Sequence, residues 1–323
     1  MLSRTQLISV LVLGLGAALL VIGSVLPRIT DQQPRVPLDL PDTTFVMESD
    51  SAVTSRIGED GFREEVEGPV RRQFHAEVIE PSDKDTMSLR VGASMTRPGE
   101  EQSGNVLDGL VQAQTWTFTV DRLTGLPTGP ARLLDQPMGV PVEVEMGGNW
   151  VKFPADTQEE TYPAFEDALR QSVDAEFTGS QERDGHRLLS FRQTVEDVNV
   201  AELYGALYTS AQFPGEGDEA VEGDLMYSAT RDWLIEPESG MIVNIAEDID
   251  ARWESEDGER LGTALLFEGE MTQANQDDLL EQALEVGDVT NVRPLGIALA
   301  AIGAILTAAG LFGALRPARE PRG

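Results

Sequence analysis

Few side chains of this sequence are suited to acid–base or metal chemistry at neutral pH. The chain contains two histidines, His75 and His186, and no cysteine. Histidine is the side chain whose ordinary pKa lies closest to neutrality, so these positions come first as proton carriers or metal ligands. Each lies in a predicted strand beside arginine or acidic neighbours. We therefore interpret both as surface or hairpin residues, and we predict no catalytic residue, no metal ligand and no cofactor.

The acidic side chains form one dense run within residues 247–257. Its carboxylates are Glu247, Asp248, Asp250, Glu254, Glu256 and Asp257. A calcium loop of the EF-hand type needs its ligands in a fixed order around a central glycine, whereas this run alternates as a strand does. We interpret it as a solvated strand face. A carboxylate pair for glycoside hydrolysis stays open among so many acids, but no nucleophile-elbow, zinc-helix or phosphate-loop motif is present.

Two uncharged apolar runs, residues 7–26 and 294–315, frame the chain. Each has about the 20 residues that a helix needs to cross a bilayer. Arg4 precedes the first run and three arginines follow the second, and basic residues near span ends stay in the cytoplasm. We therefore expect a two-pass plasma-membrane protein with both termini in the cytoplasm. A cleaved signal peptide is the alternative for the first run, although its apolar core is longer than such peptides carry.

Small residues in both runs predict that the two spans contact each other. Gly296, Ala300 and Ala304 form one row at four-residue spacing, and Gly14 with Ala18 forms a similar notch. Such rows let helix backbones approach closely within a bilayer.

The predicted division of the chain follows from these runs and from a proline-rich segment after the first. It comprises a cytoplasmic N-terminus (1–6), a transmembrane helix (7–26), a stalk (27–41), an extracytoplasmic domain (42–290), a second transmembrane helix (294–315) and a cytoplasmic tail (316–323).

The charge balance limits the partners of the central domain. The chain has 56 acidic and 24 basic residues, a net charge of −32. Nucleic-acid binding needs a basic face, and electrostatic docking on anionic headgroups needs basic clusters. We therefore predict no nucleic-acid partner and expect the bilayer to be contacted through the spans. The acidity keeps the domain soluble, and a role in attracting divalent cations or an origin in a high-salt habitat both stay open.

The central domain alternates apolar and polar residues in the way that half-buried strands do. The clearest case is residues 114–120, where Trp116, Phe118 and Val120 share one face and threonines the other. We predict an α+β fold, a mostly antiparallel β extracytoplasmic domain with barrel-like curling, flanked by N- and C-terminal transmembrane helices.

An internal echo links two of the predicted strands. Trp116 lies in TWTFTVDRLTGLPTG and Trp233 in RDWLIEPESGMIVN, each with an acid followed by Thr-Gly or Ser-Gly. The glycine suits a turn position with positive φ. Two interpretations stay open: hairpins that merely look alike, or two similar β-rich lobes.

A helical stretch is expected between the lobes, within residues 156–211. The spacing predicts a short helix after residue 161 and a longer one at 198–212. A third helix, at 275–286, leads into the second span.

Three segments carry a resemblance to a known family: GNWVKFPADT (148–157), TYPAF (161–165) and WLIEPESGMIV (233–243). With the two end spans, they make the chain similar to the actinobacterial membrane proteins labelled the porin PorA family. That label implies a cell-wall channel. Some members are linked to lipoglycan maintenance, which implies an accessory or lipid-binding role in envelope assembly. The resemblance supplies no catalytic residues.

We therefore predict a non-enzymatic envelope protein that binds a phospholipid, a lipoglycan or a related intermediate in the concave interior of a curled sheet. The aromatic candidates for the cavity are Trp116, Phe118, Trp150, Phe153, Tyr162, Phe165 and Trp233. The alternative for each is an ordinary core position. Two other classes stay open, a scaffold that recruits envelope enzymes and a channel, although two uncharged helices offer no polar pore lining.

Overall fold

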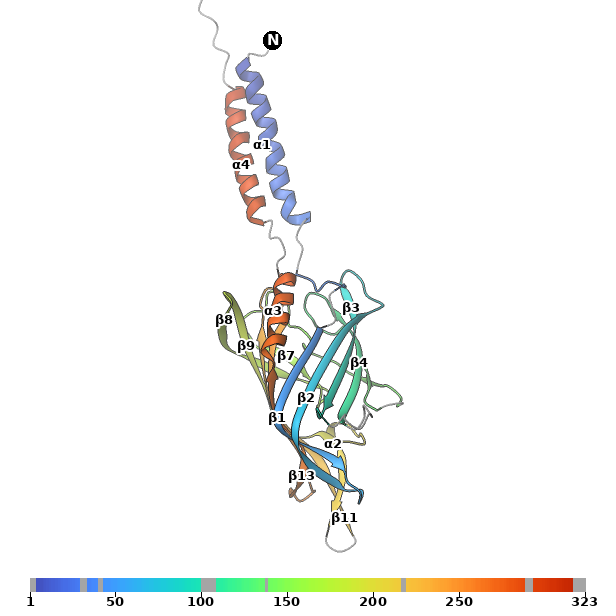
Figure 1. The fold of residues 1–323 in the computed structure, drawn as a ribbon. Helices are drawn as coiled ribbons and strands as arrows, with labels where there is room; N and C mark the ends of the chain where they lie inside the picture. The colour runs from blue at the N-terminus through green and yellow to red at the C-terminus, as the bar shows by residue number, and fades with distance from the viewer. Residues whose placement is uncertain are drawn as a thin grey trace, which may run out of the picture. The chain divides into compact units, whose positions relative to one another are not determined.

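The computed structural model describes residues 4–29, 34–39, 43–99, 109–136, 139–215, 219–287 and 293–315. The chain divides into two compact units (Figure 1). The helical unit joins the two ends of the chain, Met1–Gln33 and Val289–Gly323, and the sheet unit is Pro34–Asp288. The tail predicted at residues 316–323 lies outside the described residues.

The helical unit contains two antiparallel helices, α1 (Arg4–Ile29) and α4 (Arg293–Leu315). Helix α1 continues beyond the predicted span into the first residues of the predicted stalk. Within the described residues, one helix is long and apolar enough to cross a membrane, α4 from Leu295 to Leu315. The apolar part of α1, Ser9–Val25, is shorter. Helix α4 is therefore a candidate span by its length and composition, and the two-pass arrangement stays a prediction.

The two helices contact each other through glycines at heptad spacing. A Cβ atom added at Gly16 would overlap the backbone nitrogen of Thr307 and lie 2.9 Å from the carbonyl oxygen of Gly303. One added at Gly23 would overlap the backbone nitrogen of Ala300 and lie 2.6 Å from the oxygen of Gly296. Only glycine allows this approach, as in other small-residue helix pairs.

The predicted contact row was right at its start and wrong beyond it. Gly296 and Ala300 do face α1, but Ala304 is exposed and Gly303 takes its place. On α1, a Cβ atom added at Gly14 would meet no atom of α4 within 4 Å, and Ala18 is exposed. A strict four-residue spacing drifts around a helix, whereas alternating steps of four and three keep one face toward the partner.

We expect Gly16→Leu to separate the helices, because its side chain would enter the backbone of α4. The chain has no cysteine, so a disulfide between Ser9→Cys and Gly313→Cys reports the pairing; a Cβ at position 313 lies 3.1 Å from that of Ser9. Disulfide yield should fall severalfold with Gly16→Leu and stay unchanged with the matched Gly14→Leu. Equal yields in both variants would contradict this packing.

The sheet unit is built from 13 strands in one antiparallel sheet with the order β6-β5-β4-β3-β2-β1-β13-β12-β11-β9-β8-β7, and β10 pairs with β11. The strands are β1 (Thr43–Ile57), β2 (Arg63–Ile79), β3 (Thr86–Thr96), β4 (Leu110–Asp121), β5 (Ala131–Leu134), β6 (Val142–Val144), β7 (Tyr162–Glu166), β8 (Gln171–Arg183), β9 (His186–Asn199), β10 (Ser210–Pro214), β11 (Ala220–Ile235), β12 (Ile242–Glu254) and β13 (Arg260–Met271).

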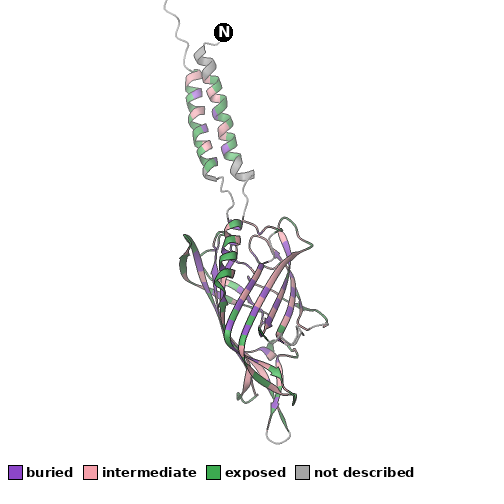
Figure 2. Ribbon diagram, in the orientation of Figure 1, coloured by how far each residue is buried: buried purple, intermediate pink, exposed green. Residues whose placement is uncertain are grey.

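The sheet is open in its hydrogen bonding but curls so that its two ends meet. Trp116 of β4 and Phe165 of β7 lie near opposite ends of the strand order, yet their ring centroids are 5.6 Å apart. Buried residues alternate along the long strands and gather on the inner face (Figure 2). The mostly antiparallel fold is confirmed, and so is the split of Trp116, Phe118 and Val120 from the intervening threonines.

Both helices predicted in the middle of the chain were wrong. The residues after position 161 form β7 and β8, and only Val200–Leu203 (α2) of the predicted 198–212 helix is helical. Helix α2 stops because the backbone of Tyr204 is extended and Ser210–Pro214 pairs with β11. Tertiary strand pairing overrides a local helical pattern here.

Helix α3 (Gln273–Gly287) confirms the third predicted helix. Its apolar face forms a second, small core with β9, β11 and β12; the residues are Leu188, Leu234, Met241, Val243, Leu280, Ala283 and Val286. The side chain of Asn275 also completes the edge of β1, accepting from the amide of Val46 at 2.9 Å and donating to the oxygen of Thr44 at 2.8 Å.

The internal echo corresponds to two equivalent turns. The carboxylate of Asp121 accepts from the amides of Leu123 and Thr124 and from the Thr124 hydroxyl. Glu236 accepts from the amides of residues 238 and 239 and from the hydroxyl of residue 239. The glycines that end these turns, Gly125 and Gly240, have φ of +72° and +75°. The resemblance between the two sequences is therefore a resemblance of turns.

Both turns hold one loop, residues 148–157, which joins the two ends of the sheet. The amide of Phe153 donates to the oxygen of Gly240 at 2.7 Å, and that of Ala155 donates to the oxygen of Leu123 at 2.9 Å. The loop also forms a hydrogen bond with β7, in which the amide of Phe165 donates to the backbone oxygen of Asn149 at 2.8 Å. We call this arrangement the clasp, since it closes the curl without a strand.

Candidate functional site

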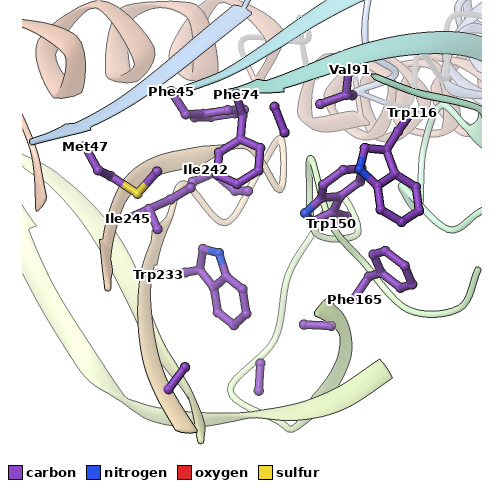
Figure 3. Packing of buried hydrophobic residues seen from close by; sticks show 14 of the residues in the cluster. Phe45, Met47, Phe74, Val91, Trp116, Trp150, Phe165, Trp233, Ile242 and Ile245 are labelled. Atoms are coloured by element: carbon purple, nitrogen blue, oxygen red, sulfur yellow. The ribbon is translucent and has the colours of Figure 1, made fainter. Parts of the chain in front are cut away.

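Six of the seven aromatic residues predicted to line a cavity are buried in the main hydrophobic core, and Tyr162 is partly buried and packs against it. Figure 3 shows Trp116, Trp150, Phe165 and Trp233 in this core. Trp150 contacts Trp116, Phe118 and Phe165, with ring centroids 5.4–5.6 Å apart. Phe153 contacts the rings of Tyr162 and Trp233, both at 5.7 Å. The contacts are mostly edge-to-face, the preferred geometry for aromatic pairs. These side chains fill one half of the interior of the sheet.

A layer of buried charges borders this aromatic half. Its members are Arg72 of β2, Glu166 and Asp167 at the end of β7, Arg231 of β11 and Glu247 of β12, and we call it the charged layer. Glu247 bridges the two guanidinium groups at 2.6 Å each. Asp167 contacts Arg72 at 3.2 Å, and Glu166 contacts Arg231 at 3.0 Å. Each member is at most 8 % exposed.

Glu166 is the acidic residue of this layer whose pKa is shifted by burial. Burial raises the pKa of Glu166, while the Arg231 guanidinium opposes that rise. The Tyr227 hydroxyl donates to Glu166 Oε1 at 3.3 Å, and burial raises the pKa of this tyrosine well above its ordinary value. Burial alone would lower the pKa of Arg231, but Glu166, Glu247 and Asp167 raise it well above its ordinary value. Two guanidinium ions therefore face three acidic side chains, and burial favours the neutral form of one of them, Glu166.

On the other side of the charged layer lies a cavity of about 360 Å³. Its walls come from β1, β2, β3, β4, β11, β12 and β13. The apolar lining residues are Met95, Leu110, Val111, Ala113, Ala168, Leu225, Ile249, Ala251, Ala264 and Leu265. The cavity is also lined by Arg72 and Asp167 of the charged layer and by the neighbouring Tyr227. Arg63 and Trp253 line it farther along the strands. This size and lining are typical of a small-molecule binding site.

A group of polar aromatic residues forms one side of the cavity. Arg170 has a positive φ of +55°, and its guanidinium lies 3.7 Å from the ring centroid of Tyr204. The same guanidinium donates to Asp135 at 2.8 Å and to the Tyr208 hydroxyl at 2.7 Å. These bonds hold residues 204–208 against the cavity in place of the predicted helix.

The clasp contains a buried lysine. Lys152 is 2 % exposed, and its Nζ donates to the oxygens of Leu123 and Phe153, each at 2.8 Å. Burial lowers the pKa of Lys152 to about 7, although the carboxylates of Asp121 and Glu236 favour the charged form. Because its hydrogen bonds go to turn and loop carbonyls and it lies outside the lining of the 360 Å³ cavity, we assign it a structural role.

The comparison with known proteins identifies the family of the chain. The family model described as Porin PorA matches residues 8–312, nearly the whole chain. The chain belongs to the porin PorA family. It is 26 % identical over 216 residues to a Porin PorA of Corynebacterium amycolatum, which covers 56 % of this chain and 53 % of that protein. A Porin PorA of Corynebacterium resistens is 27 % identical over 168 residues, covering 48 % and 38 %. The chain thus spans about half the length, or less, of these relatives.

The three segments that carry the resemblance to the porin PorA family meet at the clasp. The motif around Lys152 lies between the turn at Asp121 and the turn at Glu236. A Cβ atom on Gly240 would overlap the carbonyl oxygens of Phe153 and Pro154, so only glycine fits there. These family motifs therefore hold the sheet closed.

Sequence analysis missed the charged layer, although a signal was present. Glu247 was assigned to a solvated face, but it lies in phase with Ile245 and Ile249 and is buried with them. Arg231 lies likewise in phase with Ala229 and Trp233. A charge that occupies the apolar phase of a strand indicates a buried ion pair, because Glu and Arg are otherwise almost never fully buried. The two histidines lie elsewhere: His186 is exposed at the β8–β9 hairpin, and His75 contacts the Thr44 hydroxyl at 2.8 Å.

We expect Glu247→Gln to lower the free energy of unfolding by about 3 kcal/mol or more, because it leaves two buried guanidinium ions short of a counterion. The matched control is Glu48→Gln, which breaks an exposed pair with Arg71 and should cost less than about 1 kcal/mol. Urea unfolding followed by tryptophan fluorescence measures both, since Trp116, Trp150, Trp233 and Trp253 all lie in the sheet unit. Equal losses of unfolding free energy in the two variants would contradict a stabilising role of the charged layer.

The lowered pKa of Lys152 predicts the direction in which the unfolding free energy changes with pH. Its folded pKa, about 7, lies below its ordinary value, so the unfolded chain binds more protons above neutrality and stability rises with pH. Between pH 7 and 9 the unfolding free energy should rise by about 1–2 kcal/mol more in the wild type than in Lys152→Met. The other lysine, Lys84, is exposed, and Lys84→Met should keep the wild-type slope. If Lys152→Met shows the same rise in unfolding free energy between pH 7 and 9 as the wild type, the pKa of Lys152 is not lowered in the folded protein.

Proposed function

We propose that this protein is a non-enzymatic envelope protein whose sheet unit binds a lipid or another molecule with an apolar chain. The observation that carries the proposal is the 360 Å³ cavity, whose wall is mostly aliphatic. Burying an apolar chain there contributes about 25 cal/mol per Å² removed from water. A few polar groups at its margins fix orientation, as in other ligand sites.

The shape of the cavity also suits a chain. Glu247 in the charged layer and Trp253 in the cavity wall are six residues apart on β12, which corresponds to roughly 20 Å of strand. An acyl chain in one leaflet of a bilayer extends roughly 15 Å, half the hydrocarbon thickness. One extended chain therefore fits between the charged layer and the far end of the wall.

The proposed location is the cell membrane, with α1 and α4 as a two-pass anchor and both termini in the cytoplasm. Close packing of α1 on α4 supports insertion as a helical hairpin, since α4 alone is long and apolar enough to cross. The sheet unit would then be extracytoplasmic, where a lipid, phospholipid or lipoglycan intermediate of the envelope is within reach.

A channel is the second candidate, because the curated relatives carry the name porin. A pore through the curled sheet would have to pass the charged layer, whose members are buried and paired. Planar-bilayer recording on the purified full chain distinguishes the two functions. Stepwise conductance that survives blocking of the cavity favours the channel. A scaffold would show neither conductance nor ligand binding.

The experiment fills the cavity from within. Ala251 lines it and is buried, so Ala251→Phe should occupy the space of a ligand. The fragment Pro34–Asp288 should be stabilised by a fluorescent phospholipid analogue, because a ligand that binds only the folded state raises the melting temperature. We expect a rise of several degrees in the wild type, and little or none in Ala251→Phe.

The matched control is Thr178→Phe on the exposed face of β8, which should respond as the wild type does. A folded wild-type fragment without stabilisation by lipid analogues, and without lipid detected by native mass spectrometry after purification, would refute the proposal.

A further inference from the structure

We propose that Arg63 and Trp253 form an anion-binding subsite of the cavity, so that its ligand is an amphiphile with one apolar chain and a carboxylate or phosphate head group. This inference rests on the proposed function. It specifies the chemistry of the ligand, which neither the family nor its relatives' names supply.

Arg63 is a cation in the cavity wall with no counterion among the residues that the structure describes. It begins β2, is half-buried, and its guanidinium lies 5.5 Å from the ring centroid of Trp253. Within the described residues it has no ion pair, and burial lowers its pKa. Glu65, two residues along, uses its carboxylate to accept from the amide of Thr263 at 2.7 Å. A partly desolvated guanidinium attracts an anion more strongly than an exposed one does.

Trp253 adds a second donor at the same place. Its side chain is 2 % exposed, and its indole Nε1 is buried without a hydrogen-bond partner among the described residues. A buried donor without an acceptor is unfavourable, so a ligand oxygen that pairs with it contributes to binding. An acceptor oxygen in the cavity would pair with it and with the Arg63 guanidinium together.

The other charges along the cavity are already compensated. Arg72 is paired with Glu247 and Asp167, and Asp135 is paired with Arg170. The remaining polar wall, including Gln114, which accepts from Trp116, is neutral. Arg63 is therefore the one wall charge, among those the structure describes, with capacity for an external partner. A cationic head group would be repelled there, and a neutral one would lack the ionic contribution.

Four probes with the same chain test this assignment: dodecanoate, dodecyl phosphate, dodecanol and dodecylammonium. Affinities are measured at pH 8 by calorimetry on the full chain held in an amphipathic polymer. Charged hydrogen bonds are worth about 1.5–3 kcal/mol, so at least one anion should bind about tenfold more tightly than dodecanol. The carboxylate and phosphate arms show which anion the subsite prefers.

Arg63→Gln should weaken the preferred anion about tenfold and change dodecanol by less than about twofold. Trp253→Phe keeps the ring, removes the N–H and should weaken the anion by a smaller factor. The matched control is Arg90→Gln, which removes a charge from an exposed pair with Glu77 on the outer face of the sheet and should leave every affinity unchanged. Near-ultraviolet circular dichroism confirms that each variant is folded.

The outcomes separate this inference from the function on which it rests. Equal wild-type affinities for the anions and dodecanol overturn the anion subsite and leave chain binding intact. If Arg63→Gln weakens the affinity for all four probes equally, the anion subsite is also overturned, because the arginine then supports the structure of the cavity and does not select the head group. Binding of no probe at all refutes the cavity function itself.

Discussion

The sheet unit depends on a pair of arginines buried between carboxylates. Removing such ions from water costs several kcal/mol each, which is offset only where pairing is close. Glu247 supplies that pairing by bridging Arg72 and Arg231, at 2.6 Å to each. Arg72 belongs to β2, Glu247 to β12 and Arg231 to β11. Asp167, which follows β7, also contacts Arg72. One group of charges thus ties together strands from across the curl, and we infer that it sets the width of the interior.

The charged layer also divides the interior by the size of its side chains. On the aromatic side, tryptophan and phenylalanine occupy the inward positions and leave only small gaps, of about 20 Å³ beside Trp150 and Trp233. On the cavity side, alanines take comparable positions, among them Ala113, Ala251 and Ala264. The cavity therefore follows from the substitution of small residues for large ones along the same strands, and its floor is a rigid ionic layer.

Strand periodicity made much of this fold predictable from the sequence. The alternation in β4 and the amphipathic pattern of α3 correspond to what the structure shows, because each is decided by one buried face. The 198–212 segment was not predictable, since pairing of Ser210–Pro214 with β11 and the bonds of Arg170 to Tyr208 are long-range. The seven aromatic candidates pack in or against the core and do not line the 360 Å³ cavity. Strand alternation indicates that a residue faces inward, but it does not indicate whether the interior beside that residue is filled.

The segments that carry the sequence resemblance to the porin PorA family are among those that close the sheet. The Lys152 loop and the turn at Glu236 hold each other in the clasp, and Gly240 is confined there by direct backbone contact. By contrast, Arg63, Trp253 and the alanines of the cavity lie outside these motifs. A fold can host different functions in sites built on it. Family membership therefore leaves the ligand open, and the ligand has to be argued from the charge and volume of the cavity in this chain.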